Sequence, residues 1–310
     1  MRSHRHPGSS HRGEGEVTKY PQLTDPGIIA FLEEGEKLYP ENAVDFTMAE
    51  QRAFYDKYCA HFAGTRPANV KVEDFSVGAV ACRRYTPPES KARLLYLHGG
   101  GFVVGGLDSH DSICADLAAQ AQVEVTAVQY RLAPEHPFPA AFEDCWAVFE
   151  AVRPTIITGD SAGGNLSAAV AIHARDRGVK WLKGQVLIYP GLGGDMSKGS
   201  YITQALAPGL STKDVHYYHD VYGAQDNKLA APLRETNYAG LPPAFLVACA
   251  HDPLHDDAVE FAVRLRAAGV AAELREEPQL VHAFLRARRM SKPAAESFQS
   301  IVAAIKGFAA

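Results

Sequence analysis

The chain has 310 residues, of which 46% are hydrophobic and 22% are charged, and its formal net charge is -5. A chain of this kind can bury a large core, either as one domain with additions, which we favour, or as two small domains. The absence of a long basic block argues against nucleic-acid binding, and the absence of a long apolar run argues against a membrane span. We therefore expect a soluble protein.

The first 16 residues are rich in His, Arg, Gly and Ser and lack the apolar segment of a secretory signal. We expect residues 1–16 to form a disordered tail and the protein to be cytoplasmic, although His4, His6 and His11 are residues that can bind a metal. The five cysteines are never closer together than 23 residues. This spacing predicts buried free thiols rather than a disulfide frame or a zinc site.

Helical spacing begins at Thr24 and continues through two amphipathic segments. Asp25-Pro26 is a start signal for the first helix, and Gly64 is a stop signal for the second. We assign residues 17–66 to N-terminal cap helices. Because these helices precede the sheet, they are free to fold over another part of the chain. Their aromatic side chains suit either ordinary packing or a lid over a pocket.

Two short alternating runs, residues 70–75 and 79–85, predict an antiparallel hairpin or a pair of edge strands. An apolar strand over residues 93–97 then breaks into the glycine turn, His98-Gly99-Gly100-Gly101-Phe102. Three consecutive glycines free the backbone to point its N–H groups at one place, as a tetrahedral oxyanion needs. A flexible turn without function is the alternative, but the position just after a strand favours the oxyanion role.

Helices and strands alternate between residues 108 and 158, which predicts a parallel sheet covered by helices on both faces. The loop from Tyr130 to Pro139 interrupts this alternation. Its three prolines forbid regular structure and stiffen it. We assign the charged residues of the loop, Glu135 among them, to bracing it against the sheet rather than to direct catalysis.

A sharp turn follows at Gly159-Asp160-Ser161-Ala162-Gly163, between a β-branched run and a run of small, helix-compatible residues. Strand, tight turn and helix in this order expose a serine above the sheet. The glycines are needed because a side chain at either position would collide with the adjacent strand and helix. A chance Gly-Ser-Gly turn is the alternative, and the partners of Ser161 decide between the two.

After a buried strand at residues 185–189, the alternation breaks over residues 191–241. An insertion here sits beside the carboxyl ends of the strands, where α/β sheets bind ligands, so we assign it to the cap. We assign residues 67–310 to one catalytic domain that carries this insertion. Its remaining predicted elements are a strand at 244–250, a helix at 257–268, a strand at 272–276, a loop with His282, and a helix at 293–308.

A serine hydroxyl attacks efficiently only when an imidazole removes its proton and a carboxylate orients that imidazole. In an α/β-hydrolase sheet the acid and the histidine follow the serine in that order, each on a loop after a strand. Asp252 and His282 meet both conditions. We therefore expect Ser161 as the nucleophile, His282 as the general base and Asp252 as the orienting acid.

Neighbouring candidates fit these roles less well. Asp256 and Asp257 fall where the next helix begins, and N-capping is a sufficient explanation for them. His251 and His255 lie on the wrong loop for the base.

The backbone N–H groups of Gly100, Gly101 and Ala162 are expected to stabilise the oxyanion. The mechanism requires neither a metal nor a cofactor. A set of polar side chains is expected to support these groups: His98, Tyr130, Glu135 and Asp160.

Within this supporting set, His98 is placed to stiffen the glycine turn. Asp160 is expected to point away from His282 as a brace, held by a hydrogen bond from the loop at Tyr130.

Together these motifs resemble the bacterial hormone-sensitive-lipase-like (family IV) esterases. The resemblance covers about residue 70 to the end and rests on residues 98–102, 130–140, 159–165, 252–254 and 282–284. It implies an α/β-hydrolase fold with a mostly parallel eight-stranded sheet, helices on both faces, and a helical cap. The cap would combine the N-terminal helices with the insertion after the sixth strand. Residues 252–290 look most like bacterial acetyl esterases.

Two features depart from the family's pattern. The connection Val152-Arg153-Pro154 is shorter than usual, which could alter the back of the sheet. His255 stands where the family commonly has arginine, which could alter the charge of the pocket. Neither departure removes a catalytic group.

The resemblance and the three candidate residues predict a serine carboxylesterase that hydrolyses short-chain acyl esters of small molecules through an acyl-enzyme intermediate. An amidase, a thioesterase or a longer-chain lipase could use the same residues. A non-catalytic small-molecule receptor of the same fold is a further alternative, but such receptors characteristically lose the base, and His282 is present. The oligomeric state, a homodimer included, is left open by the sequence.

Overall fold

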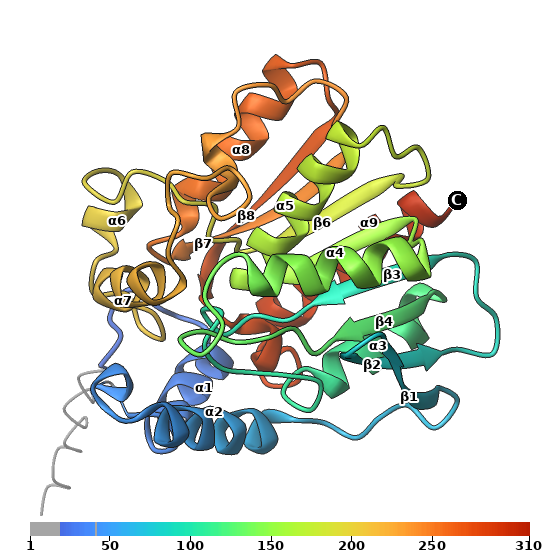
Figure 1. Ribbon diagram of the computed structural model, residues 1–310. Helices are drawn as coiled ribbons and strands as arrows, with labels where there is room; N and C mark the ends of the chain where they lie inside the picture. Colours follow the sequence, from blue (N-terminus) through green and yellow to red (C-terminus); the bar gives the residue numbers. More distant parts are fainter. Residues whose placement is uncertain (1–18, 41) are drawn as a thin grey trace, which may run out of the picture.

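A computed structural model describes residues 19–40 and 42–310 of the chain (Figure 1). The expected tail at residues 1–16, with His4, His6 and His11, lies outside the described residues. All five cysteines fall inside them and are buried free thiols, as their spacing predicted.

The described part of the chain is built on an eight-stranded sheet in the order β1-β2-β4-β3-β5-β6-β7-β8. β2 pairs antiparallel with β1 and β4, whereas every other neighbouring pair is parallel. The strands are β1 Lys71–Val77, β2 Val80–Thr86, β3 Arg93–Leu97, β4 Glu124–Val128, β5 Ile156–Asp160, β6 Gly184–Ile188, β7 Ala244–His251 and β8 Ala272–Val281. This confirms the mostly parallel eight-stranded sheet that the family resemblance implied.

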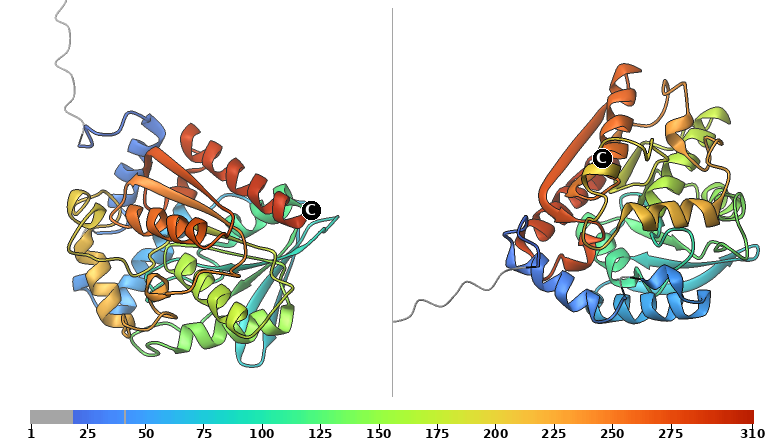
Figure 2. Two further views of the ribbon diagram at one scale, coloured as in Figure 1. Left: turned by 90° about the horizontal axis from the view of Figure 1, so that it is seen from above. Right: turned by 90° about the vertical axis from the view of Figure 1, so that its left-hand side faces the viewer.

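Helices cover both faces of this sheet (Figures 1 and 2). α3 and α9 pack on one face, and α4, α5 and α8 pack on the other. Successive side chains of β3 alternate between the two cores, with Leu94 and Tyr96 on one side and Leu95 and Leu97 on the other. Both faces are therefore buried, as predicted. The helices are α3 Asp111–Ala121, α4 Ala140–Val152, α5 Ala162–Asp176, α8 His255–Ala267 and α9 Lys292–Ala309.

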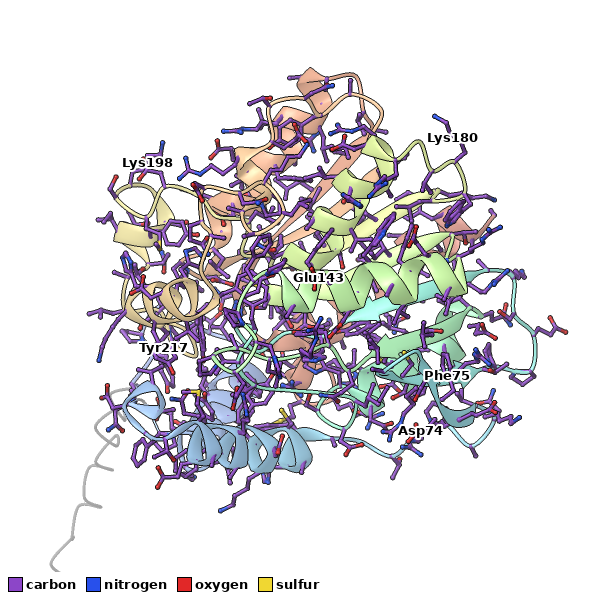
Figure 3. The ribbon with its side chains drawn as sticks, in the orientation of Figure 1. Asp74, Phe75, Glu143, Lys180, Lys198 and Tyr217 are labelled. Carbon is purple, nitrogen blue, oxygen red and sulfur yellow. The ribbon has the colours of Figure 1, made fainter. Side chains whose placement is uncertain are left out.

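Four helices from two distant segments gather at one side of the molecule (Figure 1). They are α1 Pro26–Glu36 and α2 Met48–Phe62, together with α6 Ser200–Thr203 and α7 Thr212–Tyr222. Asp25 caps α1 by accepting a hydrogen bond from the Ile28 N–H at 2.8 Å. Tyr217 belongs to α7 and is labelled in Figure 3. Nε2 of Gln51, a buried residue of α2, donates to its hydroxyl at 3.0 Å. This polar contact joins the two segments.

β8 is longer than the sequence indicated. It continues through Pro278 to Val281, so His282 directly follows the strand instead of lying within a loop. β8 is an edge strand with one pairing partner, and its register against β7 shifts near its end. A proline, which has no N–H to donate, is tolerated at such a position.

Asp256 and Asp257 do not cap α8, contrary to the expectation from the sequence. α8 begins at His255, so both aspartates lie in its first turn, and the N-cap residue is Leu254. Their carboxylates bind the start of the segment 191–241 instead. Those partners lie 56 to 65 residues away along the chain. A helix-start pattern reflects only neighbouring residues, so it could not predict them.

Asp257 is the more buried of the two, with 1% of its surface exposed. Its Oδ2 accepts hydrogen bonds from the Leu192 N–H at 2.6 Å, the Gly194 N–H at 3.3 Å and the Tyr201 hydroxyl at 3.0 Å. Burial raises the pKa of Asp257 to about 7 despite these donors. The charged form of this side chain is therefore costly in the folded protein.

We predict that the free energy of unfolding of the Asp257→Asn variant increases, relative to that of wild type, as the pH rises. An unfolded aspartate ionises near pH 4, so between about pH 4 and pH 7 the folded state binds more protons than the unfolded state, and stability falls as pH rises. The variant lacks this loss. Urea unfolding at pH 5 and pH 8 should show its free energy of unfolding gaining at least about 1 kcal/mol on wild type across that interval.

The exposed Asp226 offers a matched control. Asp226→Asn should leave the pH dependence of unfolding as it is in wild type. An Asp257→Asn difference of equal size at both pH values would contradict the prediction.

Candidate active site

Ser161, His282 and Asp252 form a continuous chain of contacts. Nε2 of His282 lies 2.9 Å from the Ser161 Oγ, and Nδ1 lies 2.6 Å from Oδ2 of Asp252. Asp252 is fully buried, and its Oδ1 also accepts a hydrogen bond from the Leu254 N–H at 2.9 Å. A carboxylate at Nδ1 favours the tautomer in which Nδ1 carries the hydrogen, which leaves Nε2 free to accept the serine proton. The structure thus brings together the three residues that the sequence singled out.

Ser161 stands on a strained turn between β5 and α5. Its φ of 56° lies in a region that side chains other than glycine seldom adopt. A Cβ added at Gly163 would lie 1.9 Å from the Leu97 carbonyl oxygen, and one added at Gly159 would lie 2.3 Å from the Gly163 carbonyl oxygen. Only glycine fits at either position. The turn therefore holds Ser161 by close backbone packing against β3.

The glycine turn presents backbone N–H groups to the same place. Gly100 and Gly101 have φ values of 126° and 60°, and both line the cavity that contains Ser161. Within the described residues, the N–H groups of Gly100, Gly101 and Ala162 donate no hydrogen bond. Ala162 is also the first residue of α5, so its N–H lies at the positive end of the helix dipole. These donors are available to an anionic oxygen.

His98 and Tyr130 support the glycine turn from behind. The Tyr130 hydroxyl donates to the His98 carbonyl oxygen at 2.7 Å, and the two rings stack with centroids 4.1 Å apart. Nδ1 of His98 lies 2.9 Å from the Gly99 carbonyl oxygen. Burial lowers the pKa of His98 to about 3, so this imidazole is neutral. A neutral ring can donate from Nδ1 to the carbonyl and hold the start of the turn.

Asp160 is held differently from the expectation. Its Oδ1 accepts hydrogen bonds from the Tyr96 hydroxyl at 2.7 Å and from the Gly99 N–H at 3.1 Å, and its Oδ2 lies 3.3 Å from Nε2 of His110. None of these partners belongs to the loop at Tyr130. The hydroxyl of Tyr130 is already bound to His98, and the Asp160 side chain points instead toward the neighbouring strand β3.

Glu135 braces its loop against α2 and not, as expected, against the sheet. Both of its carboxylate oxygens accept hydrogen bonds from Arg52, at 2.9 and 2.7 Å. Arg52 also donates to the backbone carbonyl oxygens of Val103 and Ala133. Sequence reasoning missed Arg52, because its partner lies 83 residues away and no local pattern connects them.

A cavity of about 710 Å³ lies above these groups. Ser161 and His282 lie in its lining, and further walls come from α1, α2 and the segment 191–241. Sequence reasoning also missed Arg286, a buried residue of this lining. The phenylalanine and tyrosine residues in the described wall are Tyr20, Phe31, Tyr39, Tyr55, Tyr58, Phe102 and Tyr218.

His255, which was expected to alter the charge of the pocket, is absent from the described lining of this cavity. Its ring lies beside the carboxylates of Asp256 and Glu276.

Two further findings concern the described residues as a whole. No three or more His, Cys, Asp or Glu side chains among them are arranged to hold a metal ion. No helix in residues 19–40 and 42–310 combines the length and apolar character needed to cross a membrane.

Comparison with known proteins points to one group. Residues 94–286 match a family described as having the α/β-hydrolase fold. Esterase LipI of Mycobacterium tuberculosis is 39% identical over 233 residues, which are 68% of this chain and 73% of LipI. Ethyl acetate hydrolase of Pseudomonas putida is 31% identical over 317 residues, covering 94% of this chain and 98% of that protein.

A solved structure agrees with these relatives. The hyperthermophilic esterase from the archaeon Pyrobaculum calidifontis superposes with a TM-score of 0.83 at 30% identity, covering 90% of this chain and 98% of that one. The family match spans more than half of the chain, and the Pyrobaculum calidifontis esterase shares its fold over 98% of its own length. The chain therefore belongs to the hormone-sensitive-lipase-like esterases of the α/β-hydrolase fold, and it is a carboxylic ester hydrolase.

Proposed function

We propose that this esterase hydrolyses short-chain acyl esters through an acyl-enzyme intermediate on Ser161. The observation that carries the proposal is the contact chain from Asp252 through His282 to Ser161, at 2.6 and 2.9 Å, beside three unpaired N–H groups of the described structure. This arrangement supplies a nucleophile, a base, an orienting acid and a site for an oxyanion.

In the first half of the reaction, the Ser161 Oγ attacks the ester carbonyl carbon as His282 Nε2 takes the serine proton. The carboxylate of Asp252 stabilises the imidazolium ion that forms. The oxyanion of the tetrahedral intermediate accepts hydrogen bonds from the N–H groups of Gly100, Gly101 and Ala162. The bond to the alcohol oxygen then breaks, the imidazolium donates its proton to that oxygen, and the acyl group remains on Ser161.

The second half of the reaction uses the same groups with water. His282 removes a proton from a water molecule, whose oxygen attacks the acyl carbon. The second tetrahedral intermediate is stabilised at the same three N–H groups. When it collapses, the bond to the Ser161 Oγ breaks, and the imidazolium returns its proton to the serine. The products are the carboxylic acid and the free enzyme.

We assign α1, α2 and the segment 191–241 to a cap over this site. Tyr218 of α7 lies directly against the glycine turn, because a Cβ added at Gly101 would lie 2.3 Å from its ring. Tyr39, which follows α1, lines the same cavity. The position of the Tyr218 ring supports a preference for small acyl groups. The ethyl acetate hydrolase of Pseudomonas putida, similar over nearly the whole chain, supports the same preference.

Replacement of the nucleophile should abolish turnover. Ser161→Ala removes the oxygen that forms the acyl-enzyme, so kcat toward p-nitrophenyl acetate is expected to fall at least about 10⁴-fold. Ser300→Ala, a change on α9 at a residue absent from the described lining of the cavity, should leave kcat unchanged. Mass spectrometry after reaction with an aryl phosphonate should find one label per chain, on Ser161. Full activity of Ser161→Ala would refute the serine mechanism.

The acyl preference is tested by a series of p-nitrophenyl esters from acetyl to palmitoyl. We expect kcat/KM to be greatest at two to four carbons and about tenfold lower by eight to ten carbons, because the Tyr218 ring limits the space beside Gly101. Tyr218→Ala should move the optimum to longer chains, whereas Tyr217→Phe on the same helix should not. An optimum at eight carbons or more in wild type would favour a lipase.

A further inference from the structure

A second group of buried polar side chains lies beside the three residues of the proposed mechanism. It consists of Asp160 at the end of β5, His110 just before α3, and Arg286 in the short turn Phe284–Ala287. Their exposed fractions are 5%, 2% and 6%. We call them the Asp160–His110–Arg286 cluster. The mechanism above gives none of the three a step.

Arg286 joins three parts of the structure. Its Nη1 donates a hydrogen bond to the Ser109 carbonyl oxygen at 2.8 Å, and its Nη2 donates to the Tyr55 hydroxyl at 3.0 Å. The guanidinium also lies over the rings of Tyr55 and Tyr58, 5.4 and 5.8 Å from their centroids. One side chain thus connects the turn after the base His282 with the start of α3 and with helix α2.

His110 lies between the two charged members of the cluster. Its Nε2 is 3.3 Å from Nη2 of Arg286 and 3.3 Å from Oδ2 of Asp160. Burial lowers the pKa of His110, so the ring is neutral and the formal charges are those of Arg286 and Asp160. Burial alone would raise the pKa of Asp160, but its interactions with His110, the hydrogen bond from Tyr96 and, last in size, the charge of Arg286 hold it below its usual range. Asp160 is therefore ionised.

The ionised carboxylate of Asp160 rests against the glycine turn. Its Oδ1 accepts the Gly99 N–H at 3.1 Å, and a Cβ added at Gly99 would lie 2.5 Å from its Oδ2. The next two peptides carry the N–H groups of Gly100 and Gly101. A rotation of the backbone at Gly99 would turn these donors away from the oxyanion position.

We propose that Arg286 is a positioning residue for ester hydrolysis, which acts through His110 to hold Asp160 against Gly99 and thereby aims the N–H groups of Gly100 and Gly101. The proposal rests on the oxyanion role given to those glycines above. Arg286 follows His282 by four residues, so it also fixes the position of the turn after the base relative to the glycine turn. Loss of the guanidinium leaves a buried carboxylate without its cation, and the carboxylate then shifts or takes up a proton.

The test compares Arg286→Met, Asp160→Asn and the double variant on p-nitrophenyl acetate. Each single change should lower kcat about 10- to 100-fold and leave KM within about threefold, because misaimed donors weaken the transition state more than substrate binding. The two residues act through one connection, so the double variant should lie within about threefold of the slower single variant. The proposal would be overturned if the fall in kcat of the double variant equalled the product of the falls of the two single variants. It would also be overturned if Arg286→Met kept kcat within threefold of wild type.

Arg288 provides a matched control two residues further on. It is 7% exposed, and it binds Asp116 at 2.7 and 2.9 Å and the Ser112 Oγ at 3.1 Å. It is absent from the described lining of the cavity. Arg288→Met should lower the melting temperature by breaking a buried ion pair, yet keep kcat within about threefold of wild type. An equal fall in kcat for both arginine variants would reduce Arg286 to a purely structural role and refute the proposal.

A second variant covers the case in which Arg286→Met does not fold. Arg286→Lys keeps the positive charge, but one ammonium group cannot reach the Ser109 carbonyl, the Tyr55 hydroxyl and His110 together. Its kcat should be at least about fivefold lower than that of wild type, and an unchanged kcat would overturn the proposal.

Phosphonate labelling separates this proposal from the proposed function. If the serine mechanism holds, the folded Arg286 variant should take one label on Ser161, at a rate reduced together with kcat. Labelling at the wild-type rate would overturn the positioning role and leave the serine mechanism intact. No labelling of Ser161 in wild type, with full activity of Ser161→Ala, would refute the serine mechanism itself.

Discussion

The close packing of the Ser161 turn against β3 is the constraint on which the rest of the site depends. Gly163 lies so near the Leu97 carbonyl oxygen that no side chain fits between them. Since β3 and β5 are neighbours in the sheet, this contact sets the serine beside the glycine turn, which begins one residue after Leu97. Asp252 and His282 reach the same place because β7 and β8 end at the same edge of a parallel sheet.

Two buried aspartates near this edge show how their surroundings decide what a carboxylate does. The interactions of Asp160 with His110, the hydrogen bond from Tyr96 and the charge of Arg286 hold its pKa below its usual range, so it stays ionised. Asp257 receives three hydrogen bonds but, with burial dominant, its pKa rises to about 7. The first rests on the glycine turn, and the second fastens the segment 191–241 to α8. Similar burial therefore leads to a charged carboxylate in one place and, in the other, to a carboxyl group that ionises only near pH 7.

Local patterns predicted the sheet, the helices on both faces and the residues at the ends of β5, β7 and β8, because strand periodicity and turn chemistry are properties of neighbouring residues. They failed where the partner is distant. Glu135 binds Arg52 on α2, Asp160 binds Tyr96, and Asp257 binds the segment after β6, none of which is near in sequence. The predicted strand ended at residue 276, whereas β8 continues through Pro278 to Val281, which its position at the edge of the sheet allows.

By itself, the sequence predicted a parallel sheet covered by helices and identified Ser161, Asp252 and His282 as candidates, because turn glycines and alternating elements are local features of the chain. Its motifs also resembled a known family, and that resemblance implied the α/β-hydrolase fold. The tertiary structure decided what surrounds them. It placed Arg286 in the cavity wall and Arg288 against Asp116, although the two arginines are separated by one residue. The direction in which a side chain points, and the charge it meets when buried, depend on segments that meet only after folding. Residue spacing in the sequence does not predict these tertiary contacts.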